Sequence, residues 1–137
     1  ALGVRLCMPE DSVRGDSLLL LEAEPLAVSV GIASMRKKGE AVSGDRGTYF
    51  KTDAGQLCVI LSDGMGCGES AADGSIGTVG MLEEFLRSGV SPALAMKLLN
   101  SAMLLRDGEN WGYATVDLMC MNLFTGEADF YNARPTW

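Results

Sequence analysis

The stretch TYFKTDAGQLCVILSDGMGCG, residues 48–68, predicts the centre of the fold. Its two apolar runs, TYFKT and LCVILS, flank the short loop DAGQ, which is the pattern of a β-hairpin. The second run ends at Asp63, and glycines follow it at every second position. The chain is therefore expected to turn sharply directly after the strand that carries Asp63.

Two helices are predicted after this turn. Residues 69–88 place apolar side chains at helical spacing, and Gly89 is expected to end the helix. Ser91 and Pro92 then form an N-cap followed by a proline at the first helical position. The stripes expected to be buried are Ala72, Ile76, Val79, Leu82, Phe85 and Leu86 in the first helix, and Leu94, Leu98, Ala102 and Leu105 in the second.

Strands are predicted on both sides of this central region. Residues 113–124 and 127–133 form two strands around a tight TG turn, and residues 3–8 and 17–22 form short strands. From residue 26 to 37, apolar and small residues alternate, which indicates a strand covered on one face. The order of strands, two helices and strands predicts an α+β fold with antiparallel sheets and a packed helix pair, in contrast to a parallel doubly wound sheet.

Composition excludes several classes of function. The 137 residues suit one domain, and a net charge of −7 disfavours nucleic acid as a partner. The chain has no histidine, which excludes Ser-His-Asp and Cys-His catalysis, and its four cysteines form no CxxC pair. No apolar run reaches the roughly 18 residues of a membrane span, and the first residues lack the layout of a signal peptide, so we expect no membrane contact by this chain. The cysteine pattern favours a reducing, cytoplasmic setting.

Asp63 is the first candidate for a functional residue. The glycines after it match neither a P-loop nor the Rossmann pattern, whereas a carboxylate beside exposed backbone carbonyls suits Mg²⁺ or Mn²⁺. Asp45 lies in a second glycine-containing turn, before the first arm of the hairpin, so the antiparallel pairing brings the two carboxylates toward one end of the sheet. The alternative is that Asp63 only caps backbone N–H groups in a hairpin-to-helix turn and that Asp45 is an exposed turn residue.

These residues carry a resemblance to a known family. VSGD at 42–45, SDGMGCG at 62–68 and TVDL at 115–118, with the two helices between them, resemble the phosphatase domain of the stage II sporulation protein E family. This bacterial family is metal-dependent and similar to protein phosphatase 2C. The resemblance covers about residues 26–135 and implies that the chain is part of an α-β-β-α sandwich.

The resemblance implies a two-metal site. Asp63 would bridge two Mn²⁺ or Mg²⁺ ions, the carbonyl of Gly64 would ligate one of them, and Asp45 would coordinate the other metal or its water. A water activated between the metals would attack phosphorus in line. The family's remaining aspartates lie downstream of NARPTW, and Asp117 and Asp129 do not match them, so residues 1–137 are expected to form a single, incomplete domain with little or no activity.

The implied function is a serine/threonine phosphatase that acts on a phosphorylated regulatory protein of the anti-anti-sigma factor type during sporulation. The parent protein is expected to be cytoplasmic and potentially membrane-anchored, and the two helices would shift the metal site between inactive and active states. One alternative is a non-catalytic phosphatase-like module that forms homodimers through its helices or a sheet edge. Another is a thiol-based regulator centred on Cys67, near a helix N-terminus.

Overall fold

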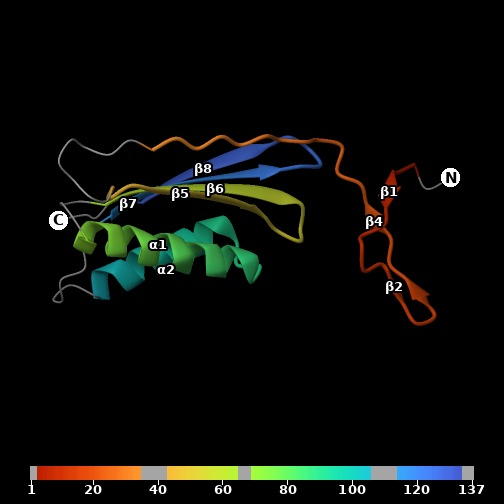
Figure 1. Ribbon diagram of the computed structural model, residues 1–137, viewed down its shortest axis with the longest axis horizontal. Helices are drawn as coiled ribbons and strands as arrows, with labels where there is room; N and C mark the ends of the chain where they lie inside the picture. The colour runs from red at the N-terminus through yellow and green to blue at the C-terminus, as the bar shows by residue number, and fades with distance from the viewer. Residues whose placement is uncertain (1–2, 35–42, 65–68, 106–113, 134–137) are drawn as a thin grey trace.

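The fold is built around one antiparallel sheet. The computed structural model describes residues 3–34, 43–64, 69–105 and 114–133. Four strands pair in the order β5-β6-β7-β8, and two helices cover one face of the sheet (Figure 1). The elements are β5 (Arg46–Lys51), β6 (Gln56–Gly64), α1 (Glu69–Arg87), α2 (Pro92–Leu105), β7 (Ala114–Asn122) and β8 (Ala128–Ala133). The α+β prediction is confirmed.

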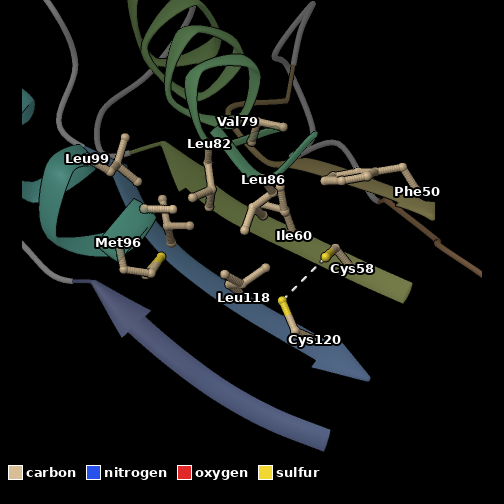
Figure 2. Packing of buried hydrophobic residues seen from close by; sticks show 12 residues of the cluster. Phe50, Cys58, Ile60, Val79, Leu82, Leu86, Met96, Leu99, Leu118 and Cys120 are labelled. Carbon is tan, nitrogen blue, oxygen red and sulfur yellow. Dashed lines mark hydrogen bonds between the residues drawn. The ribbon is translucent and has the colours of Figure 1, made fainter. Parts of the chain in front are cut away.

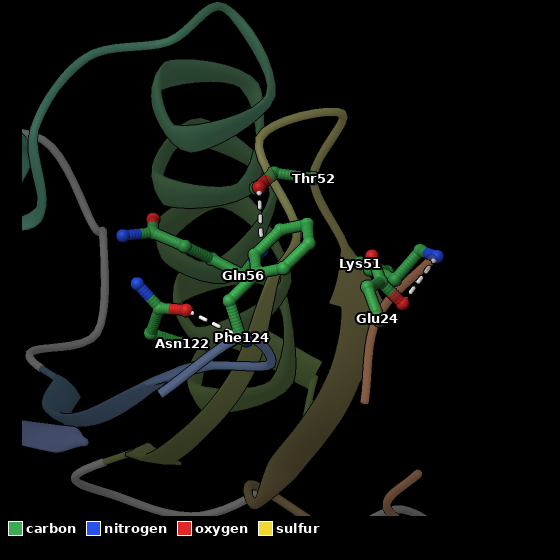
Figure 3. Close-up of polar contacts among 6 residues, drawn as sticks. All are labelled: Glu24, Lys51, Thr52, Gln56, Asn122 and Phe124. Atoms are coloured by element: carbon green, nitrogen blue, oxygen red, sulfur yellow. Dashed lines mark hydrogen bonds and ion pairs between the residues drawn. The ribbon is translucent and has the colours of Figure 1, made fainter. Parts of the chain in front are cut away.

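The β5–β6 hairpin forms as predicted. Gly55 adopts a φ of +72° in the turn, and its N–H donates to the carbonyl of Thr52 at 3.1 Å. The Thr52 hydroxyl accepts the N–H of Gln56 at 3.2 Å (Figure 3). A glycine suits this turn because L side chains rarely adopt a positive φ. The turn fixes the register, which pairs Arg46 with Ser62 at the other end of the hairpin.

The β7–β8 turn is stabilised by the side chain of Asn122. Its Oδ1 accepts the N–H of Phe124 at 2.8 Å (Figure 3) and that of Thr125 at 3.2 Å. Gly126 has a φ of +82° and donates its N–H to the Asn122 carbonyl at 2.8 Å. The TG dipeptide therefore forms the predicted tight turn.

Helix α1 ends in a Schellman motif. Gly89 has a φ of +83°, and the N–H groups of Gly89 and Val90 donate to the carbonyls of Leu86 and Phe85 at 3.1 and 3.0 Å. These bonds satisfy carbonyls that would otherwise lack partners at the helix end. The predicted stop at Gly89 is thus confirmed.

The core lies between the helices and the sheet. Side chains alternate along β6 and β7, so every second residue faces the helices. Figure 2 shows this cluster, in which the Sγ atoms of Cys58 and Cys120 lie 3.4 Å apart as free thiols. The buried members are Phe50, Cys58, Ile60, Val79, Leu82, Leu86, Ala95, Met96, Leu99, Val116, Leu118 and Cys120.

The predicted buried stripes are partly wrong. In α2, Leu94 and Leu98 are 49% and 41% exposed, whereas Ala95, Met96 and Leu99 are buried. Ile76 of α1 is likewise half exposed. The sequence of α2 is apolar on more than one face, so its periodicity alone does not determine which face packs on α1 and β8.

The N-terminal segment forms two small pairs of strands apart from the main sheet (Figure 1). β1 (Leu6–Cys7) pairs with β4 (Leu21–Glu22), and β2 (Val13–Arg14) pairs with β3 (Ser17–Leu18). Within the described residues, no helix is long and apolar enough to cross a membrane.

The strand predicted at residues 26–37 is wrong over its described part. Residues 26–34 belong to no strand and run along the sheet on the side away from the helices (Figure 1). The Leu26 N–H donates to the carbonyl of Leu123 at 3.3 Å, and Lys51 pairs with Glu24 at 3.0 Å (Figure 3). Among the described residues, residues 26–34 join no strand ladder, although they run along the sheet.

Candidate metal centre

Asp63 lies one residue before the end of β6. The alternation of the strand buries Ser62 and Gly64 on the helix side and leaves Asp63 exposed on the opposite face. In the register with β7, Asp63 lies opposite Thr115. The carboxylate is therefore at the end of the sheet and accessible from the face that the helices do not cover.

Asp45 lies next to Asp63. The ladder pairs Arg46 with Ser62, and one further step places Asp45 opposite Asp63. The Gly64 N–H donates to the carbonyl of Gly44 at 3.2 Å, which continues the pairing beyond the end of β5. The convergence expected from the sequence is present in the structure.

Asp45 lies close enough to Asp63 to affect its pKa. Partial desolvation raises the pKa of Asp63 above its ordinary value, and a side-chain hydrogen bond with Asp45 and the charge of Asp45 raise it further. Two neighbouring carboxylates repel each other when both are ionised. A divalent cation between them would remove this repulsion.

The turn that carries Asp45 is held from two sides. The Ser43 hydroxyl accepts the N–H of Asp45 at 3.2 Å, and Ser75 of α1 donates its hydroxyl to the carbonyl of Gly44 at 2.7 Å. The sequence reasoning did not identify Ser75. The sequence feature that could have indicated it is the spacing of Ser75, which places this polar residue on the same helix face as the buried residues Val79 and Leu82.

The two aspartates that were not expected to be ligands, Asp117 and Asp129, lie outside the Asp45–Asp63 pair. Asp117 is exposed on β7 and accepts a hydrogen bond from the side-chain amide of Asn132. Asp129 lies on β8 opposite Cys120, toward the other end of the sheet from Asp63. Neither Asp117 nor Asp129 joins the Asp45–Asp63 pair.

Cys67, the centre of the alternative thiol hypothesis, lies outside the described residues.

The donor set fits a hard divalent cation. Two carboxylates converge at a strand end beside a glycine backbone, and oxygen donors of this kind suit Mg²⁺ and Mn²⁺. Among the described residues, no group of three or more histidine, cysteine, aspartate or glutamate side chains is arranged to hold a metal. The pair therefore supplies part of a coordination shell, and weak affinity is expected from so few ligands.

Asp63→Asn should stabilise the chain when divalent cations are absent. The raised pKa of Asp63 means that its protonated form stabilises the fold. This contribution is complete below the unfolded-state pKa of about 3.9 and is lost as the pH rises through the folded-state value. Because Asp63 is exposed and solvent screens its charge, in chelator at pH 7 we expect a gain of no more than about 1 kcal/mol in the free energy of urea unfolding, which vanishes as the pH falls below about 4. A less stable variant at pH 7 would contradict this, and Asp129→Asn serves as the control.

The family model of stage II sporulation protein E matches residues 53–136, more than half of the chain. The chain belongs to the stage II sporulation protein E family. A curated member, stage II sporulation protein E from Priestia megaterium, is 34% identical over 109 residues, which are 80% of this chain. Those residues are 18% of the relative's length, so the chain spans a small part of that family member.

Solved structures confirm the fold. The structure of the PP2C phosphatase domain of stage II sporulation protein E from Bacillus subtilis, with a fragment of its regulatory domain, has a TM-score of 0.72 and 24% identity. The match covers 97% of this chain and 45% of that chain. RsbX in complex with magnesium is similar with a TM-score of 0.54 and 19% identity, over 74% of this chain and 57% of that chain. The expected PP2C-like fold is thus confirmed.

Proposed function

We propose that this chain is part of a metal-dependent serine/threonine protein phosphatase. The observation that carries the proposal is the register that places Asp45 opposite Asp63, with the Gly64 N–H bonded to the Gly44 carbonyl beside them. Membership of the stage II sporulation protein E family supports it. RsbX, which has a similar fold, was solved in complex with magnesium, and this supports a divalent cation as the cofactor.

Each residue has a distinct role in this proposal. Asp63, the backbone carbonyl of Gly64 and Asp45 would hold the Mn²⁺ or Mg²⁺ ions. When bound, a pair of such ions lowers the pKa of a water and stabilises the charges that develop on a transferred phosphoryl group. The chain orients the two carboxylates through the β5–β6 register. No histidine is required, in agreement with the composition.

The proposed substrate is a phosphoserine on a small regulatory protein of the anti-anti-sigma factor type. The sporulation relatives support this pathway. A cytoplasmic site of action belongs to the same proposal. The net charge of −7 repels phosphate, so substrate recognition depends on the cations at Asp45 and Asp63. With divalent cations bound beside Asp45 and Asp63, the positive charge of the cations would attract the negatively charged phosphoserine.

We further propose that residues 1–137 are a single, incomplete domain with weak or no activity alone. Two carboxylates and one carbonyl are few protein ligands for two hard cations, because they leave most of the octahedral positions to water. Activity is therefore to be measured in the full-length protein that carries this sequence.

The test is release of inorganic phosphate from a phosphoserine protein. We expect full-length protein with Mn²⁺ to release phosphate, and excess chelator to stop the release. Re-addition of Mn²⁺ should restore it. Release that is unaffected by the chelator, or no release with any divalent cation, would overturn the proposal.

A second candidate function is a non-catalytic interaction module. Its support is an apolar row across the face that the helices leave uncovered, formed by the successive cross-strand partners Tyr49, Val59, Met119 and Phe130. Tyr49 and Phe130 are 53% and 78% exposed. Sedimentation at several concentrations tests the homodimer version, which a strictly monomeric chain would exclude.

A further inference from the structure

We propose that Ser75 is a positioning residue that fixes the Asp45 turn for cation binding. The inference rests on the proposed function and adds a residue on α1 that ligates nothing. Ser75 is fully buried, and its hydroxyl donates to the Gly44 carbonyl at 2.7 Å. Gly44 immediately precedes Asp45, so this bond acts on the backbone that carries the carboxylate.

The carbonyl oxygen of Gly44 links the turn that carries Asp45 to both α1 and β6. It accepts the Ser75 hydroxyl from α1 and the Gly64 N–H from the end of β6. Gly64 follows Asp63 directly, so both carboxylates are one residue away from groups bonded at this carbonyl. Fixing a single oxygen therefore fixes the spacing of Asp45 and Asp63.

Two other serines, Ser88 directly after α1 and Ser101 in α2, behave differently. Ser88 and Ser101 donate to carbonyls four residues earlier, at Glu84 and Lys97, and both are exposed. That local bond is the ordinary choice for a serine in a helix. Ser75 instead bonds to a residue 31 positions away in sequence. A buried hydroxyl directed out of its own helix thus has a tertiary role.

The chain also offers a matched control. Ser62 adjoins Asp63 and is 3% exposed, but its buried hydroxyl has no hydrogen-bond partner within the described residues. Removing an unpaired buried hydroxyl breaks no bond, whereas removing that of Ser75 leaves the Gly44 carbonyl with one donor fewer. Ser62→Ala and Ser75→Ala make the same chemical change on the same side of the sheet.

The experiment compares this chain with Ser75→Ala and Ser62→Ala in two measurements. The first is amide hydrogen exchange at Gly64 without divalent cations, and the second is Mn²⁺ affinity by calorimetry. We expect Ser75→Ala to speed exchange at Gly64 about fivefold to tenfold and to weaken Mn²⁺ binding by a similar factor. Exchange at the core amides of Ile60 and Leu118 should stay unchanged, and Ser62→Ala should match the wild type in both measurements.

The exchange measurement separates this inference from the proposed function. If the wild type binds no Mn²⁺, the proposed metal site fails in this chain, but the exchange rate at Gly64 still determines whether Ser75 fixes the turn. If Ser75→Ala exchanges at Gly64 within twofold of the wild type, the inference is wrong. Equal acceleration at Gly64, Ile60 and Leu118 would also overturn it, because Ser75 would then only stabilise the whole fold.

Discussion

Asp63→Asn should lower the Mn²⁺-dependent release of phosphate by the full-length protein at least about 100-fold. Asparagine keeps the size of the side chain but loses the charge and one of the two oxygen acceptors. Hard cations depend on the number and charge of their oxygen ligands, and Asp63 is proposed to contact both ions. The rate is measured as inorganic phosphate released from a phosphoserine protein at saturating Mn²⁺.

The control for this substitution is Asp129→Asn. Asp129 is exposed on β8, and its cross-strand partner is Cys120, whereas Asp63 lies opposite Thr115 at the other end of β7. The same chemical change there should leave the rate within twofold of the wild type. If Asp63→Asn kept more than half of the wild-type rate, Asp63 would not be the central ligand and the proposed mechanism would be abandoned.

Leu82→Ala should cost about 3–4 kcal/mol in the free energy of unfolding of this chain. Leu82 has no exposed surface and belongs to the cluster between α1 and the sheet, together with Ile60 and Leu118 (Figure 2). Truncation removes buried methyl groups and leaves a cavity that a close-packed core fills only in part. Urea denaturation at a fixed pH gives the difference directly.

Leu98→Ala is the matched control for the core. Leu98 was predicted to be buried but is 41% exposed, so the same truncation should cost less than about 1 kcal/mol. Similar losses in the two variants would mean that α2 packs through the face predicted from its sequence and would contradict the described core. The pair therefore also tests the corrected orientation of α2.

Local chemistry made the hairpin, the helix ends and the β7–β8 turn predictable. Gly55, Gly89 and Gly126 all adopt positive φ at the predicted turns or helix stop. Short-range signals of this kind depend only on neighbouring residues. The buried face of α2 and the state of residues 26–34 depend on partners that are distant in sequence, which no local pattern specifies.

The candidate site shows the same division. The hairpin register was sufficient to bring Asp45 toward Asp63, because antiparallel pairing relates residues on the two arms in a simple way. Ser75 was missed because its contact with Gly44 crosses 31 residues and depends on how α1 sits on the sheet. A polar residue in line with the buried apolar positions Val79 and Leu82 was the available signal.

A calorimetric titration of this chain and its Asp63→Asn variant with Mn²⁺ tests the central claim, that Asp45 and Asp63 together hold a divalent cation. Saturable binding by the wild type, with a dissociation constant on the order of 10⁻⁴ to 10⁻³ M and lost in the variant, is the predicted result. The same isotherm for both proteins, or no saturable binding by the wild type, would contradict it.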